Sequence, residues 1–312
     1  MPVRTERRVT RLAQGFLDDT ITEKAQHRNI SALEEYISIL KEFQVAKIAC
    51  GATGVVRRAK NSSAVLYNIA AETGIECQIL SEQSEALLAA TGILSVIPET
   101  GGNLLTFDIG GGSTEFVLTG AVTPPSTSSR PVGAATLTEA FLKGDPPGTE
   151  AVCQAVLSAR NEIMLAKEQL YENLKKTGTI LFLAGLRLVG TAGTVTTLAA
   201  MHMKMARYVP YRVNGMVLER DWLSNTIESL AQMPLAERRL IAGLEAGRED
   251  IILGGAVIVS EILSCFGHDS FVVSDAGLLE GLLIELIEKE SAPSSGKGAA
   301  LRTSLTWRLQ KG

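Results

Sequence analysis

The sequence predicts an α/β fold with two domains, and three observations support this prediction. Short apolar segments alternate with segments of helical periodicity, a pattern typical of a parallel sheet covered by helices. Glycine-rich turns follow several of the predicted strands. The chain has 312 residues, 46% of them hydrophobic, and a mean hydropathy of +0.17. A chain of this length and composition can bury two cores and is not typical of disordered proteins.

The first predicted domain, residues 1–100, alternates helix and strand. Asn29 or Ser31 is predicted to cap a helix whose apolar positions continue to Phe43. Residues 45–50 predict a strand that ends in a loop at 51–54. A helix at 62–73, ended by Gly74, precedes a strand at 75–80. Ser81 is predicted to open the next helix, which ends before Pro98.

The second predicted domain, residues 101–290, begins with two strands around a glycine hairpin. The Pro-, Ser- and Thr-rich stretch 121–131 predicts a surface loop. The remaining predicted elements are helices at 134–143 and 149–176, a strand at 181–190, helices from about 195, at 219–231 and at 249–265, a strand at 271–274 and a helix at 277–289. Residues 291–312 are predicted to be a disordered tail.

Charge and hydropathy exclude several classes of protein. The net charge is −4 and the isoelectric point is near 5.6, so a general attraction to nucleic acid is not expected. No apolar run approaches the roughly 20 residues that span a bilayer, so no membrane span is expected. The N-terminal residues lack the apolar region of a signal peptide, which favours the cytoplasm.

The cysteines and histidines are dispersed along the chain. The four cysteines, at positions 50, 77, 153 and 265, lack C-x-x-C spacing. This pattern predicts small apolar core residues in a reducing compartment, with neither a zinc site nor a disulfide framework. The three histidines are equally scattered, so a histidine-based metal site or triad is not expected.

The most informative stretch is Asp-Ile-Gly-Gly-Gly-Ser-Thr-Glu at residues 108–115. Apolar strands are predicted on both sides, at 104–107 and 116–118. Glycines in such a tight hairpin let main-chain N–H groups converge on an anion without interfering side chains. We therefore predict that Gly110, Gly111, Gly112 and Ser113 bind phosphate. The alternative is a glycine-rich turn that only connects two strands.

Two carboxylates, Asp108 and Glu115, bracket this hairpin. Beside a phosphate site they would repel the ligand unless a divalent cation lay between them. Carboxylate oxygens are suitable ligands for Mg²⁺, and Mn²⁺ would also serve. Asp108 and Glu115 are therefore predicted as metal ligands.

Further residues could complete an active site. The turn 190–194 contains Gly193 and Thr194 between a strand and a helix, where N–H groups and the helix dipole favour an anion. An ordinary strand-to-helix turn explains it equally well, and the turn 275–277 indicates helix capping. Arg57 could bind phosphate oxygens, although a solvated arginine is the alternative. Glu85, in the first turn of a helix, could act as a general base or only complement the helix dipole.

Seven stretches together resemble the exopolyphosphatase / guanosine pentaphosphate phosphohydrolase family, within the superfamily of acetate kinase, sugar kinases, chaperone ATPases and actin. The matching stretches occur in the family's order and cover about residues 1–288. They are residues 7–12 (RRVTRL), 52–61 (ATGVVRRAKN), 81–86 (SEQSEA), 108–115 (DIGGGSTE), 190–194 (GTAGT), 247–255 (GREDIILGG) and 274–281 (SDAGLLEG).

The resemblance implies two actin-like (ribonuclease-H-like) α/β domains with a cleft between them. It implies that Glu85 activates water, that Arg57 lines a phosphate channel, and that Asp108 and Glu115 position Mg²⁺ and water. Residues 110–113 then match the second phosphate-binding loop. The implied reaction releases a terminal phosphate from polyphosphate, or the 5′-phosphate of guanosine pentaphosphate, and the sequence does not choose between these substrates. A homodimer is also implied.

One departure concerns the start of the chain. The family opens with a strand hairpin that carries a first phosphate loop of the pattern Asp-x-Gly-Ser/Thr-Asn-Ser/Thr, and nothing here matches it. Residues 2–8 match a segment that lies downstream of that loop, so the first domain is expected to be truncated at its N-terminus. We expect that the true start lies upstream; a mass of 33.2 kDa for the protein from its native cells would contradict this.

Two other functions remain open at this level. The protein could be a catalytically weak or inactive nucleotide-binding sensor or regulator, which the missing loop favours and the three acids oppose. It could also be an ATP-dependent kinase or ATPase of the wider superfamily, because fold analogy alone does not separate these activities.

Overall fold

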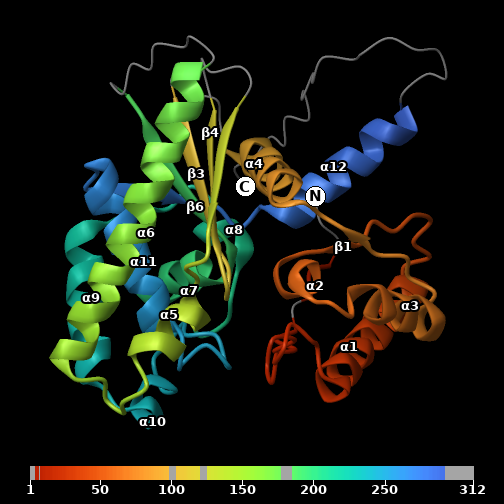
Figure 1. The fold of residues 1–312 in the computed structure, drawn as a ribbon, viewed down its shortest axis with the longest axis horizontal. Helices are drawn as coiled ribbons and strands as arrows, with labels where there is room; N and C mark the ends of the chain where they lie inside the picture. The colour runs from red at the N-terminus through yellow and green to blue at the C-terminus, as the bar shows by residue number, and fades with distance from the viewer. Residues whose placement is uncertain (1–3, 7, 98–102, 120–124, 177–184, 292–312) are drawn as a thin grey trace. The chain divides into compact units, whose positions relative to one another are not determined.

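The structure is a computed structural model and describes residues 4–6, 8–97, 103–119, 125–176 and 185–291 (Figure 1). The chain forms two compact units. Unit 1 comprises Met1–Glu85 and Glu285–Ala292, and unit 2 comprises Ala86–Ile284 and Pro293–Gly312.

This division differs from the predicted domains 1–100 and 101–290, because two helices each contribute to both units. These are α4 (Glu82–Val96) and α12 (Leu278–Ser291). Within unit 2 their backbones approach so closely that a Cβ on Gly281 of α12 would lie 1.9 Å from the carbonyl oxygen of Leu88 on α4. All but the first residue of the predicted tail 291–312 lies outside the described residues.

Unit 1 is a small α/β unit with a two-stranded parallel sheet. Beyond its share of α4 and α12, its elements are α1 (Glu23–Glu42), β1 (Gly51–Ala52), α2 (Gly54–Arg58), α3 (Ser62–Thr73) and β2 (Gln78–Ile79). Ile21, Ile30, Val56, Val65 and Ile69 belong to its apolar core. The prediction of α3 is confirmed, and Gly74 ends this helix in the left-handed conformation with φ of 71°.

Two predictions in unit 1 are wrong. Helix α1 begins at Glu23, because the side chain of Thr22 caps it by accepting from the N–H of Ala25; Asn29 and Ser31 lie inside the helix. The strand predicted at 45–50 lies instead at Gly51–Ala52, within the predicted loop. Which residues of this segment form the strand depends on pairing with β2, and an apolar run in the sequence does not reveal that pairing.

The prediction that no disulfide forms is also wrong. Cys50 and Cys77 form a disulfide with a Cα–Cα distance of 4.6 Å. Each cysteine directly precedes one strand of the parallel pair, whose register places Gly51 opposite Gln78. The two cysteines are 27 residues apart in the sequence, and this spacing alone does not show that strand pairing brings them together. Cys153, which is exposed, and Cys265, which is partly buried, are free.

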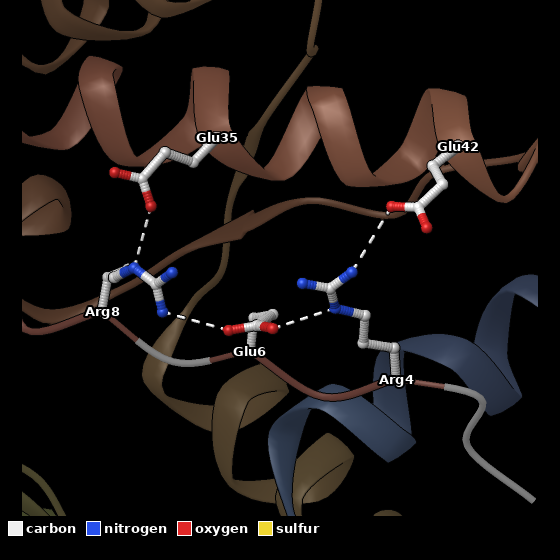
Figure 2. Close-up of polar contacts among 5 residues, drawn as sticks. All are labelled: Arg4, Glu6, Arg8, Glu35 and Glu42. Carbon is white, nitrogen blue, oxygen red and sulfur yellow. Dashed lines mark hydrogen bonds and ion pairs between the residues drawn. The ribbon is translucent and has the colours of Figure 1, made fainter.

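A chain of ion pairs connects the N-terminal segment to helix α1 (Figure 2). Glu6 accepts from Arg4 Nε at 2.9 Å and from Arg8 Nη1 at 3.1 Å. Arg8 also donates to Glu35, and Arg4 to Glu42, both on α1. The hydrogen bond from Arg4 is the largest cause that lowers the pKa of Glu6, followed by the one from Arg8. The hydrogen bond to Glu35 is the largest cause that raises the pKa of Arg8, followed by the one to Glu6.

Unit 2 is built on a six-stranded mixed sheet in the order β5-β4-β3-β6-β8-β7. Strands β3, β6 and β8 are parallel, whereas β4, β5 and β7 pair antiparallel. The strands are β3 (Leu104–Ile109), β4 (Thr114–Thr119), β5 (Ser126–Arg130), β6 (Arg187–Thr191), β7 (Val217–Glu219) and β8 (Ser270–Val273). The helices are α5 (Ala134–Phe141), α6 (Thr149–Lys176), α7 (Ala192–His202), α8 (Pro210–Val213), α9 (Arg220–Gln232), α10 (Leu235–Arg238) and α11 (Ile252–Phe266).

The two strands around the glycine hairpin are confirmed, and the predicted loop 121–131 is wrong in part. Residues 126–130 form strand β5, which pairs with β4. Serine side chains of this strand form hydrogen bonds with residues of α6. Ser126 donates to the carbonyl of Leu170, and Ser128 donates to Gln169. These partners, distant in the sequence, make a serine-rich strand possible. The first residues of the strand predicted at 181–190 lie outside the described residues.

The main core of unit 2 lies between the sheet and a layer of helices. In Figure 1, α6, α9 and α11 cover one side of the sheet, and this layer packs on Phe107, Phe116 and Phe271. The unit 2 part of α4 covers the other side, where Ala86 and Ala90 pack against Val117 on β4. Among the described residues, no helix combines the length and apolarity that crossing a bilayer requires.

Removal of the disulfide is expected to destabilise unit 1. In Cys50→Ser the loop between the cysteines no longer constrains the unfolded chain, which should cost about 3 kcal/mol. Denaturant unfolding with and without a reducing agent measures this loss. Cys153→Ser, at an exposed free cysteine, is the control and should unfold like the parent. A parent protein whose unfolding is insensitive to reductant would contradict the prediction.

Glu6 is expected to titrate at a lower pH than an ordinary glutamate. Its contribution to stability should be present at neutral pH and disappear as the pH falls through its lowered pKa. An NMR titration of the carboxyl carbon measures this pKa, and Arg4→Gln/Arg8→Gln should return it to the ordinary value. High salt should reduce the difference, because these charges are exposed. Identical titrations in both proteins would argue against the network.

Candidate active site

The glycine hairpin joins β3 to β4 at the carboxyl end of β3. The N–H of Gly110 donates to the carbonyl of Ser113 at 3.0 Å and closes the turn. Gly111 is exposed, and Gly112 and Ser113 are partly exposed. The hairpin therefore lies at the surface of unit 2, although both of its strands are buried.

Helix α5 binds the carbonyl groups of this hairpin. The N–H of Ala134 donates to the Gly110 carbonyl at 2.9 Å, and the N–H of Ala135 donates to the Gly111 carbonyl at the same distance. Gly133 precedes the helix and lies against the hairpin, since a Cβ on it would be 2.5 Å from the carbonyl carbon of Gly111. Because the first N–H groups of α5 hold these carbonyls, the orientation of the hairpin peptides is set.

The hairpin N–H groups remain available for a ligand. Within the described residues, the main-chain N–H groups of Gly111, Gly112 and Ser113 donate to no protein acceptor. Three consecutive N–H groups in a turn are a common binding site for an anion. The phosphate site predicted at residues 110–113 stays a prediction, and of its four N–H groups the one of Gly110 is already used within the turn.

The two acids of the motif lie face to face. Asp108 on β3 and Glu115 on β4 are direct partners in the antiparallel register, so both side chains project from the same side of the sheet. Glu115 is buried, and its Oε1 accepts from the hydroxyl of Ser129 on β5 at 3.2 Å. Thr191 on β6 is the parallel partner of Asp108 on the other side.

The donor set of Asp108 and Glu115 fits a divalent cation such as Mg²⁺. Two facing carboxylates supply hard oxygen ligands, and Mg²⁺ commonly takes one or two carboxylates together with substrate phosphates and water. No cluster of three or more His, Cys, Asp or Glu side chains that could hold a metal occurs among the described residues. Any cation here would therefore depend on ligand oxygens or water for its remaining contacts.

The second glycine turn connects β6 to helix α7. Ala192 adopts the left-handed conformation with φ of 68°, an uncommon state for a residue with a side chain. Gly193 faces Arg248, because a Cβ on Gly193 would lie 2.0 Å from Arg248 Nη2. An arginine thus lies beside the first N–H groups of α7, where both charge and helix dipole favour an anion.

Thr194, predicted to bind phosphate at this turn, has no exposed side chain. It is buried, and its side chain packs against Gly255 on α11. Only its main-chain N–H could contact a ligand at this turn. The turn at 275–277 is confirmed as a helix start, in which Glu280 accepts from the N–H of Gly277. Asp275 accepts from the hydroxyl of Tyr208.

Arg248 is a candidate residue to which the sequence analysis assigned no role. Its side chain is 22% exposed and its guanidinium pairs with Glu245, which holds it beside the turn. In the same segment the carboxylate of Glu249 accepts from the main-chain N–H of Gly247. The pKa of Glu249 is lowered, mainly by a hydrogen bond from the main-chain N–H of Glu249 itself to its carboxylate. The sequence Gly-Arg-Glu-Asp directly before an apolar helical segment was the feature from which a role for Arg248 could have been predicted.

In unit 1, the predicted base and the predicted phosphate-binding arginine form an ion pair. Arg57 Nη1 donates to Glu85 Oε2 at 2.7 Å and to the carbonyl of Leu80 at 2.9 Å. Its Nη2 lies 3.7 Å from Oε1 of Glu82, which is exposed. Arg57 therefore joins α2 to the first turn of α4 and orients the Glu85 carboxylate.

Comparison with known proteins identifies relatives over almost the whole chain. The Ppx/GppA phosphatase family matches residues 1–290. Exopolyphosphatase 2 of Mycobacterium tuberculosis is 29% identical, with 91% of this chain and 89% of that protein covered. A bifunctional 3-dehydroquinate synthase/phosphatase of Fusobacterium nucleatum is 29% identical over 86% of this chain, which spans only 40% of that protein.

Solved structures agree with this assignment. The crystal structure of the Aquifex aeolicus Ppx/GppA family member has a TM-score of 0.73 and 30% identity, covering 92% of this chain and 89% of that chain. An exopolyphosphatase-like protein has a TM-score of 0.80 and 27% identity, with 91% of each chain covered. The predicted family resemblance and its two-domain actin-like fold are confirmed.

Gly133→Ala is expected to disturb the hairpin. The added Cβ would lie 2.5 Å from the Gly111 carbonyl, so the hairpin must move, at a cost of about 1–3 kcal/mol. Thermal unfolding measures the cost, and phosphate binding followed by calorimetry should weaken. Gly148→Ala, where no atom lies within 4 Å of the added Cβ, is the control. Parent-like stability and phosphate affinity in Gly133→Ala would exclude the contact described for α5.

Proposed function

Because the chain belongs to the Ppx/GppA phosphatase family, we propose that it hydrolyses terminal phosphoanhydride bonds. The proposed substrate is inorganic polyphosphate, as the names of the exopolyphosphatase relatives suggest, or the 5′-phosphate end of guanosine pentaphosphate. The main observation in support is the set of three available N–H groups in the hairpin, bracketed by the facing carboxylates Asp108 and Glu115.

In this proposal the hairpin binds the terminal phosphoryl group. The N–H groups of Gly111, Gly112 and Ser113 donate to its oxygens and stabilise the negative charge that develops in the transition state. Asp108 and Glu115 would hold a divalent cation, Mg²⁺ or Mn²⁺, and the bound ion would neutralise charge on the phosphate oxygens. Phosphoryl transfer requires little covalent work from the protein, so positioning and charge supply most of the catalysis.

Glu85 is the proposed general base for the attacking water. Its pairing with Arg57 at 2.7 Å keeps the carboxylate in one orientation, which a base needs in order to accept a proton from a positioned water. Glu85 is the last residue of unit 1, and the next residue in helix α4, Ala86, packs against Val117. Arg57 is therefore proposed to position Glu85 in addition to attracting phosphate.

The turn at α7 is proposed to bind a phosphate further along the substrate. The N–H groups of Gly193 and Thr194 belong to the first turn of this helix, and the Arg248 guanidinium adds positive charge beside them. A substrate with several phosphates would use both glycine turns, whereas a single phosphate would need only one. This difference favours a polyphosphorylated substrate over a simple phosphomonoester.

The proposal is tested by measuring phosphate release from polyphosphate, guanosine pentaphosphate and a phosphomonoester, each with and without Mg²⁺. We expect release from at least one of the first two substrates only when Mg²⁺ is present. Tight binding of guanosine nucleotides with no turnover of any substrate would instead support a sensor. Faster hydrolysis of the monoester would contradict the proposed substrate class.

Glu85→Gln is expected to lower the rate of phosphate release by about 10²–10⁴-fold, because the amide cannot accept the proton. Substrate affinity should change little, since size and polarity are kept. Glu82→Gln is a matched control, because this exposed acid lies in the same helical turn and 3.7 Å from Arg57. A near-parental rate in Glu85→Gln would remove Glu85 from the mechanism.

A further inference from the structure

Four polar side chains form a row across the sheet of unit 2. Ser129 on β5 is the direct partner of Glu115, Glu115 is the partner of Asp108, and Asp108 is the partner of Thr191. Direct partners project from the same side of a sheet. The two proposed metal ligands therefore lie between two hydroxyl side chains.

The hydroxyl of Ser129 contacts one defined oxygen of Glu115. The Oγ–Oε1 distance is 3.2 Å, and the glutamate residue is only 4% exposed. A buried carboxylate needs hydrogen-bond donors to offset its lost hydration. A donor on the neighbouring strand, at the directly opposite position, also restricts rotation of the carboxylate.

The preceding residue, Ser128, has the opposite orientation. Its hydroxyl donates to Gln169 on α6 at 2.7 Å, and the residue is buried on the side of the sheet that α6 covers. Residues that alternate along a strand project to opposite sides. The chain thus contains two adjacent serines on one strand, of which only Ser129 contacts the carboxylate of the site.

We propose that Ser129 is a positioning residue whose hydroxyl orients Glu115 toward a divalent cation shared with Asp108. This inference rests on the proposed function of the two acids. Ser129 itself contacts neither the cation nor the substrate. It holds the Oε1 atom of Glu115, so that the carboxylate enters the site in one orientation, and partners of metal ligands of this kind commonly change metal affinity by 10–100-fold.

The test compares Ser129→Val with Ser129→Thr, because these variants have nearly the same shape and differ in the hydroxyl. The primary measurement is the Kd for Mn²⁺ by electron paramagnetic resonance, and the second is the Mg²⁺ concentration that half-saturates phosphate release. Ser129→Val should raise both by about 10-fold or more. Ser129→Thr should restore most of the affinity. Both residues suit a strand, so the fold should be kept.

Ser128→Ala is the control on the same strand. It should lower the melting temperature, because it removes a buried hydrogen bond, and should leave the Kd for Mn²⁺ unchanged. Equal Mn²⁺ affinity in the Val and Thr variants, or an equal loss in Ser128→Ala, would overturn the role of Ser129. Failure of the parent protein both to bind Mn²⁺ and to release phosphate would instead refute the proposed function itself.

Discussion

The contact between helix α5 and the glycine hairpin determines how unit 2 can bind an anion. The first N–H groups of the helix are used by the carbonyls of Gly110 and Gly111, so the helix end itself is not the binding site. The N–H groups of the hairpin are left for the ligand instead. Only glycine at position 133 permits this contact, because any side chain there would meet the hairpin backbone. The site thus depends on two glycine segments that pack backbone against backbone.

Sheet register places the acids next to this hairpin. Asp108 and Glu115 face each other because β3 and β4 form a tight hairpin with direct pairing. The neighbouring strands β5 and β6 then supply hydroxyl side chains at the same level of the sheet. A shift of one residue in either pairing would move a side chain to the opposite face. The geometry of the acids is therefore a property of the whole sheet.

The turn at α7 depends on similarly close packing within unit 2. Gly255 of α11 allows the side chain of Thr194 to pack directly on that helix, and the lack of a side chain at Gly193 leaves room for the Arg248 guanidinium. In unit 1 the Arg57–Glu85 pair connects two helices that follow short parallel strands, and the disulfide joins the starts of those strands. Close packing in unit 2, and an ion pair and a disulfide in unit 1, position the candidate residues.

The sequence by itself determined the family, the strands around the hairpin, and the set of acids and glycines with chemical potential, because these are local patterns of hydropathy and turn residues. It did not show that residues 126–130 form a strand, that Cys50 bonds to Cys77, or that Arg248 lies beside Gly193. Each of these depends on residues far apart in the chain that come together only when sheets pair and helices pack. Tertiary structure decided them, because register and close packing have no local signature in the sequence.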